Sequence, residues 1–228
     1  MAMADVSSKA PARHWSGPEP SGAARKVYLG IMQELERGRM VPGQRLVETE
    51  LAQRYEVGRN AVREAMQHLA VRGIVDLSPN RSPAIRLLDL AECLEVLEVA
   101  SALTRLAARS AAQAYDGDAA AALEAAVEDV AEAAQSGEPA AFSRARRGFY
   151  RCLLTIGGNR ELQRLFPAIA MHIIHAQYPS PRLQGIRLAD YRAIAAAVAG
   201  GDPEAADRAA REHVETVRAI ILELARQG

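Results

Sequence analysis

The chain has 228 residues, of which 49% are hydrophobic and 25% are charged, and its 28 Lys and Arg residues balance its 28 Asp and Glu residues. This composition excludes a disordered chain and is sufficient for one large or two small domains with a true core. The two cysteines, Cys93 and Cys152, are too few for a disulfide scaffold. No apolar run reaches the roughly 18 to 20 residues of a membrane span, and none forms a signal-peptide core. We therefore expect a cytoplasmic protein with no membrane contact.

Charge is unevenly distributed along the chain. Residues 21–88 contain 11 Arg and Lys against 7 Asp and Glu, a net charge of +4, whereas residues 89–228 contain 15 against 19, a net charge of −4. A basic module joined to an acidic one is typical of a nucleic-acid-binding domain attached to a domain with another role.

The N-terminal third alternates helical and turn signals. Residues 1–20 mix Pro, Ser, Gly and Ala without periodicity and are predicted to form a flexible tail. Helical periodicity starts at Ser21, and three helices are followed by two short extended segments around the loop sequence SPNRSP. The expected helices are 21–38, 48–55 and 60–71, and the expected extended segments are 74–77 and 84–88. Three helices followed by a hairpin predict a winged helix-turn-helix over residues 21–88.

From Asp89 onward every segment has helical periodicity and is rich in Ala, Leu, Glu and Arg. Breaks are predicted at residues 116–117, 137, 157–158, 179–185 and 200–203. The fold class is therefore mainly α, with a bundle of about six helices over residues 89–228 behind the winged helix.

The third predicted helix lies within VGRNAVREAMQHL, residues 57–69. Four polar side chains fall on the face opposite its apolar stripe, namely Arg59, Asn60, Arg63 and Gln67. Arg can bind guanine through two hydrogen bonds, Asn and Gln can bind adenine, and such a helix fits the major groove. A solvated helix face is the alternative interpretation, but the preceding turn and the following wing favour DNA recognition.

The run GRMVPGQRLVETELAQRYEVGRNAVREAMQHLAVRGIVDLSPNRSPAIRLL resembles the DNA-binding domain of the GntR family of bacterial transcription regulators. The resemblance implies that Arg59, Asn60 and Arg63 contact bases or phosphates and that Arg45 contacts the DNA backbone. It also implies that the wing residues Asn80 and Arg81 approach the minor groove. Two positions depart from the family pattern, because Gly58 replaces the usual Ser or Thr N-cap and Ser82-Pro83 replaces the usual Gly-Ala.

The helical remainder is similar to the FCD-type ligand-sensing domain of the FadR branch of that family, through LEVASALTRLAARSAA, FYRCLLTIGGNRELQRL and the pattern around His213. Many members of this branch bind a divalent metal through an Asp and three His, and the metal can hold a carboxylate effector. Here those four positions are Arg146, Tyr150, Tyr191 and His213. Ala100 and Thr104 replace a customary Arg and Glu. Because Arg has no free lone pair and neutral Tyr is a poor ligand, we expect no metal cofactor.

Helical geometry distinguishes the arginines of RARRGFYRCL, residues 144–153. Arg146 lies about 20° beyond Leu153 and borders the apolar face, whereas Arg144, Arg147 and Arg151 are predicted to face solvent. Tyr191 and His213 fall on apolar stripes and are predicted to face inward. One hypothesis is that Arg146 supplies the positive charge of the missing metal and binds an anionic effector with Tyr150, Tyr191 and His213. The alternative is an internal network in which Arg146 pairs with a carboxylate such as Asp190 or Glu98.

His172 and His175 are secondary candidates for the same cavity or for a metal, and surface or internally satisfied histidines are the simpler interpretation.

These patterns predict a homodimeric transcription regulator that binds a palindromic operator, with a small organic acid as effector. Repression relieved by the effector is implied by the resemblance alone. Two rival functions remain: a constitutive DNA-binding dimer whose pocket has decayed, and a metal-dependent enzyme using His213 with Tyr150 or Tyr191. No nucleophile with its base and no phosphate-binding Gly-rich loop is visible in the sequence, so the expected protein is not an enzyme.

Overall fold

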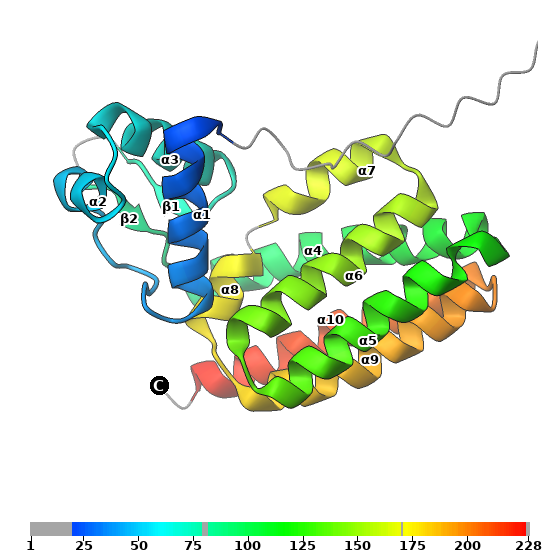
Figure 1. Cartoon of the computed structure of the whole chain (residues 1–228). Helices are drawn as coiled ribbons and strands as arrows, with labels where there is room; N and C mark the ends of the chain where they lie inside the picture. Colours follow the sequence, from blue (N-terminus) through cyan, green and yellow to red (C-terminus); the bar gives the residue numbers. More distant parts are fainter. Residues whose placement is uncertain (1–19, 79–81, 170, 227–228) are drawn as a thin grey trace, which may run out of the picture.

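A computed structural model describes residues 20–78, 82–169 and 171–226, with the side chains of residues 168 and 181–187 excepted. The chain is 76% helical. An N-terminal region of three helices and a hairpin lies beside one end of a bundle of longer helices (Figure 1). The predicted fold class, a winged helix-turn-helix followed by an all-α bundle, is therefore confirmed.

The N-terminal region contains the three predicted helices, α1 (Gly22–Glu36), α2 (Glu48–Arg54) and α3 (Arg59–Val71). The hairpin strands β1 (Val75–Asp76) and β2 (Ala84–Ile85) are antiparallel, with Val75 opposite Ile85. Both strands are shorter than predicted. One reason is that the chain leaves the ladder early: the side chain of Gln177 accepts a hydrogen bond from the Leu88 amide and donates one to its carbonyl.

The bundle begins with α4 (Leu90–Ala114), whose first turn carries a complete capping box between Asp89 and Glu92. The other described helices of the bundle are α5 (Ala120–Ser136), α6 (Pro139–Gly157), α7 (Arg160–Leu165), α8 (Met171–Gln177), α9 (Pro181–Ala199) and α10 (Pro203–Ala225). Short 3₁₀ turns, η1 (Gly117–Ala119) and η2 (Phe166–Ala168), precede α5 and follow α7.

The described bundle has seven α-helices, so the prediction of about six missed one division. The division falls near Pro167, which lacks a backbone N–H and cannot continue the α-helical bonding of α7. The predicted break over residues 179–185 was too long, because α9 starts at Pro181. Proline is well tolerated in the first turn of a helix, where its missing N–H has no intrahelical partner.

The hydrophobic core of the N-terminal region continues into the bundle. Val27 and Ile31 of α1 belong to the same buried cluster as Ile173 and Ile174 of α8 and Val217 of α10. A second cluster, around Phe149 and Tyr191, fills the bundle itself. The two regions are therefore packed against each other over apolar surface, and the division into domains at residues 88 and 89 stays a prediction.

Gly30 lies where α1 approaches the turn after α2. A Cβ atom at this position would lie 2.3 Å from Cε1 of Tyr55. Gly148, in the middle of α6, is a matched helical position at which a Cβ would meet nothing within 4 Å. A methyl group added at Gly30 should therefore destabilise the fold, whereas one added at Gly148 should not.

We expect the steric conflict in Gly30→Ala to lower the free energy of unfolding by roughly 1 to 3 kcal/mol, because the Tyr55 ring must move. The higher helix propensity of alanine offsets part of this loss. Gly148→Ala should raise it by about 0.5 to 1 kcal/mol. Urea unfolding of both variants measures the difference. Equal stabilisation by the two substitutions would contradict the close approach of α1 to Tyr55.

Candidate functional site

The exposed face of α3 carries the predicted DNA-reading residues. Arg59, Asn60, Arg63 and Gln67 are all exposed, while Val62, Ala65, Met66 and Leu69 are buried on the opposite face. Gly58 is the N-cap and provides no side-chain cap, so the first amide groups of α3 are not capped by that residue. Arg45 is also exposed. Asn80 and Arg81 lie outside the described residues.

Arg63 is held by an acidic partner that the sequence did not suggest. Its Nε donates to both carboxylate oxygens of Glu48 on α2, at 2.9 Å each. The pair fixes the direction of the guanidinium on the exposed face and leaves its terminal nitrogens available for other acceptors. The Arg63 side chain is therefore already oriented by Glu48. Its contact with DNA stays a prediction.

A cavity of about 780 Å³ lies between the N-terminal region and the bundle. Its wall includes residues of α1, the end of α3, α4, α6, α8, α9 and α10. Among its described lining residues, seven are arginines and one is a carboxylate, Glu36. The seven are Arg25, Arg37, Arg72, Arg144, Arg146, Arg147 and Arg151. We call this space the interdomain cavity.

The four residues at the positions where the resemblance implies a metal site come together in the wall of this cavity. Arg146, Tyr150, Tyr191 and His213 are 6%, 8%, 0% and 4% exposed, respectively. The predictions that Arg146 borders the core and that Tyr191 and His213 face inward are confirmed. We call these four residues the inner cluster. Its aromatic rings pack closely, with Tyr191 5.0 Å from His213 and 4.8 Å from Phe149 between centroids.

Within the inner cluster, His213 is bonded on both sides of its ring. Its Nδ1 lies 3.0 Å from Oδ2 of Asp190, and its Nε2 lies 3.0 Å from the Tyr150 hydroxyl. With Asp190 ionised, Nδ1–H donates to the carboxylate and Nε2 accepts from Tyr150. These two hydrogen bonds fix the orientation of the His213 and Tyr150 rings and occupy one oxygen of the Asp190 carboxylate. No ion pair joins Arg146 to Asp190 among the described residues. Glu98, the other partner considered for Arg146, is exposed.

Arg146 has no such compensation. Its Nη2 is buried and has no hydrogen-bond partner among the described residues. Burial lowers the pKa of this guanidinium, although the nearby Tyr191 and Tyr150 act in the opposite direction. An isolated buried charge costs several kcal/mol unless it is paired and hydrogen-bonded. An anion held against Nη2 would remove that cost.

The donor set does not fit the divalent metal implied by the FCD fold. A histidine that ligates a metal commonly donates its other ring N–H to a carboxylate, as His213 does to Asp190. Here, however, the Tyr150 hydroxyl lies on Nε2, and the fixed cation of Arg146 occupies the same cluster. No group of three or more His, Cys, Asp or Glu side chains is placed to share a metal within the described ranges. That the site works without a metal stays a prediction.

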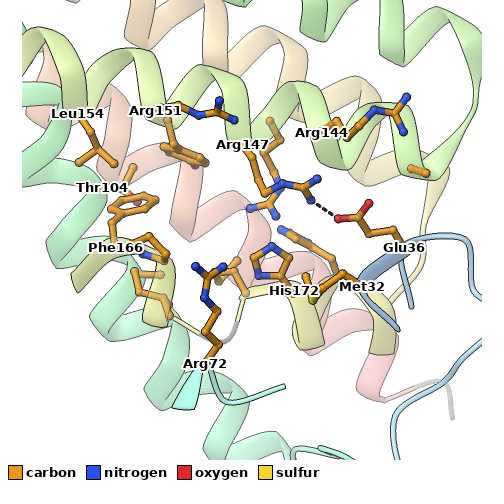
Figure 2. A pocket seen from close by; sticks show the side chains of 18 of the residues that line it. Met32, Glu36, Arg72, Thr104, Arg144, Arg147, Arg151, Leu154, Phe166 and His172 are labelled. Carbon is orange, nitrogen blue, oxygen red and sulfur yellow. Dashed lines mark hydrogen bonds and ion pairs between the residues drawn. The ribbon is translucent and has the colours of Figure 1, made fainter. Parts of the chain in front are cut away.

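Arg147 corrects the prediction that three arginines of α6 face solvent. Arg144 and Arg151 are exposed, although both border the cavity. Arg147 is half-buried and forms an ion pair with Glu36 at the end of α1, while Nη1 also donates to Ser143. Figure 2 shows this pair bridging the two regions. The periodicity of α6 could not reveal it, because the partner lies 111 residues away.

His172 and His175 are both half-buried and both line the cavity. Whether either binds an effector or a metal stays a prediction. The Nε2 atom of His172 is buried and has no hydrogen-bond partner among the described side and main chains. Burial lowers the pKa of His172 well below 6.5, and the positive charges of Arg146, Arg147 and Arg72 lower it further. His172 is therefore neutral at pH 7 and has a ring nitrogen directed into a cationic space.

Sequence reasoning missed Arg72 and Glu36 as residues of the cavity. Arg72 is the C-cap of α3, and its Cζ lies 5.5 Å from the ring centroid of Tyr28 on α1. Neither position carries a distinguishing local pattern. Their place in the cavity results from the packing of the N-terminal region against α6 and α8.

Comparison with known proteins agrees with both halves of the structure. Residues 95–216 match the FCD domain family, and residues 23–85 match the family of bacterial regulatory proteins called gntR. The chain is 28% identical over 193 residues to a protein of Paenarthrobacter nicotinovorans named "Probable D-xylose utilization operon transcriptional repressor", covering 84% of this chain and 85% of that one.

Two solved structures share the fold. McbR/YncC of E. coli superposes with a TM-score of 0.76 at 18% identity, covering 90% of this chain and all of that chain (100%). The transcriptional regulator GntR of Rhodococcus sp. RHA1 superposes with a TM-score of 0.73 at 22% identity, covering 88% and 97%.

No helix in the described part of the chain is both long and apolar enough to cross a bilayer. The family and the curated relative named above are regulators of transcription and not enzymes. The chain belongs to the GntR family of bacterial transcription regulators, with an FCD domain behind its DNA-binding domain, and it is a DNA-binding regulator and not an enzyme.

Proposed function

We propose that this protein is a cytoplasmic, effector-responsive repressor that binds a palindromic operator as a homodimer and is released by a small organic anion. The observation that carries the effector proposal is the buried guanidinium of Arg146, whose Nη2 has no partner among the described residues. An anionic group placed against it would form charge-assisted hydrogen bonds in a site of low dielectric constant.

The inner cluster supplies the rest of this binding site. Tyr150 and Tyr191 line the cavity beside Arg146, and their rings can pack against an organic anion that binds there. The guanidinium offers a planar fork of donors that matches the two oxygens of a carboxylate. In this proposal Arg146 performs the electrostatic role that a metal performs in relatives, and no metal takes part.

The constitutive alternative, a regulator whose pocket has decayed, is less well supported. A decayed pocket should be filled by apolar side chains, because collapse removes an empty space. Instead, the interdomain cavity keeps a volume of about 780 Å³ and a lining dominated by cations. Maintaining such a space is costly unless an anion occupies it.

The homodimer is supported by an uncovered apolar stripe on α4. Val99 and Leu106 are 54% and 43% exposed, and Ala102 is exposed between them on the same face at helical spacing. Contiguous exposed apolar positions commonly mark a contact surface. Two copies packed through α4 would be related by a two-fold axis, which matches a palindromic operator.

DNA recognition is tested at α3. We expect Arg59→Ala and Arg63→Ala each to weaken operator binding by about 1 to 3 kcal/mol, as the loss of a base contact does. Fluorescence anisotropy with a labelled operator, at one fixed salt concentration, measures this. Arg192→Ala, which removes an exposed arginine from α9, is the control. Unchanged affinity in both α3 variants would show that α3 does not enter the groove as proposed.

The dimer is tested at α4. Leu106→Glu places a charge in the stripe and should convert the dimer to a monomer, since burial of an unpaired carboxylate opposes association. Analytical ultracentrifugation reads the mass directly. Leu165→Glu, at a leucine of α7 that is 57% exposed, is the matched control. A dimer that persists in Leu106→Glu would exclude α4 as the interface.

The effector site is tested by a thermal-shift screen of small carboxylates, in buffer free of phosphate, with and without added zinc. We expect at least one carboxylate to raise the Tm of the wild-type protein equally with and without zinc, because binding to the native state stabilises it. The shift should vanish in Arg146→Ala. Stoichiometric metal that co-purifies with the protein and is lost in His213→Ala would contradict the metal-free site.

A further inference from the structure

The interdomain cavity extends well beyond the inner cluster, and its outer part has its own set of cations. We propose that Arg72, Arg147 and His172 form a second subsite, selective for phosphate, so that the effector is a phosphorylated organic acid. Its carboxylate would lie on Arg146 and its phosphate between α3, α6 and α8. The inference rests on the proposed anion site at Arg146 and adds a second contact on the DNA-binding domain.

Three elements contribute to this subsite. Arg72 ends α3, Arg147 comes from the middle of α6, and His172 lies in α8. Figure 2 shows Arg72 and His172 directed into the same space, below Arg147 and its ion pair with Glu36. Cationic and donor groups that converge from separate elements suit a tetrahedral anion, which presents oxygens in several directions.

The pKa of His172 is affected by the positive charges of the nearby arginines. Burial lowers the pKa of His172, and the charges of Arg146, Arg147 and Arg72 lower it further. All four residues line the interdomain cavity. A neutral imidazole can place its N–H on either ring nitrogen. With the proton on Nε2, the buried atom that has no partner among the described residues becomes a donor for a phosphate oxygen.

Glu36 already places an anionic group in this subsite. Its side chain is 8% exposed, and its carboxylate binds Arg147 across the boundary between the two regions. It is the single carboxylate among the described lining residues, against seven arginines. A phosphate would compete with Glu36 for Arg147, and it carries more negative charge than the carboxylate it replaces.

The location of the subsite gives the effector direct contact with the DNA-binding domain. Arg72 follows the last residue of α3, the helix that carries Arg59 and Arg63, and Glu36 is the last residue of α1. A ligand that holds Arg72 and displaces Glu36 changes the contacts of both helices with the bundle. A ligand that binds better to an arrangement of the domains without the Arg147–Glu36 ion pair would shift the population toward that arrangement, which is the requirement for allosteric coupling.

Inorganic phosphate is the probe for this subsite. Its effect on Tm is measured by titration in the low-millimolar range against sodium chloride of equal ionic strength, for the wild-type protein and for each variant relative to its own Tm. We expect saturable stabilisation of the wild-type protein. Arg72→Gln should weaken the phosphate affinity roughly tenfold, and Glu36→Gln should strengthen it roughly three- to tenfold, because Arg147 loses its competitor.

Arg192→Gln removes the same charge outside the cavity and should respond as the wild type does. Arg146→Gln should keep the phosphate response while losing the carboxylate response, which separates the two subsites. Wild-type behaviour in both Arg72→Gln and Glu36→Gln would overturn the second subsite. If Arg146→Gln lost the phosphate response while Arg72→Gln and Glu36→Gln kept it, phosphate would bind at Arg146. That result would overturn the second subsite and leave the proposed carboxylate site intact. Absence of any phosphate response in the wild-type protein would refute the second subsite and leave the carboxylate screen unaffected.

Discussion

The buried positive charge of Arg146 is the constraint on which the rest of the cavity depends. A guanidinium that is 6% exposed and whose Nη2 has no partner among the described residues must be compensated by its surroundings or by a ligand. The carboxylate that the sequence suggested as its partner, Asp190, is already bonded to His213. Tyr150 is likewise committed to His213. The internal network thus satisfies the histidine and the tyrosine, and in the proposed function an anion from outside the chain compensates the arginine.

The second constraint is the continuous apolar packing between the N-terminal region and the bundle. Ile173 and Ile174 of α8 share a buried cluster with α1 residues such as Val27. Beside this apolar contact, the ion pair of Arg147 with Glu36 and the hydrogen bonds of Gln177 with Leu88 link the two regions. Apolar contact is non-directional, whereas these polar contacts depend on geometry. The polar contacts are therefore the ones that a charged ligand can exchange without dismantling the core.

The sequence was a reliable guide wherever a property depends on one helix. The 3.6-residue period placed Arg146 at the apolar face of α6 and turned Tyr191 and His213 inward, and the structure confirms all three. It failed for Arg147 because a single helix pattern distinguishes only core from surface. The surface of α6 at Arg147 is covered by α1, so its burial is a property of tertiary packing. Arg72 and Glu36 were missed for the same reason: each becomes part of the cavity only when the two regions meet.

Arg146 and Arg147 are adjacent, and through them α6 contacts both the inner cluster and the N-terminal region. Successive residues of an α-helix point about 100° apart, so one guanidinium enters the inner cluster while the next reaches the boundary with α1. A metal held by several helices cannot provide this arrangement, because it is one charge at one point. Two arginines on one helix, unlike a bound metal, cannot be removed by a chelator. In the proposed function, an anion bound to Arg146 acts on a helix whose next residue, Arg147, contacts the N-terminal region through Glu36. The proposed ligand site and this interdomain contact are then joined by a single peptide unit.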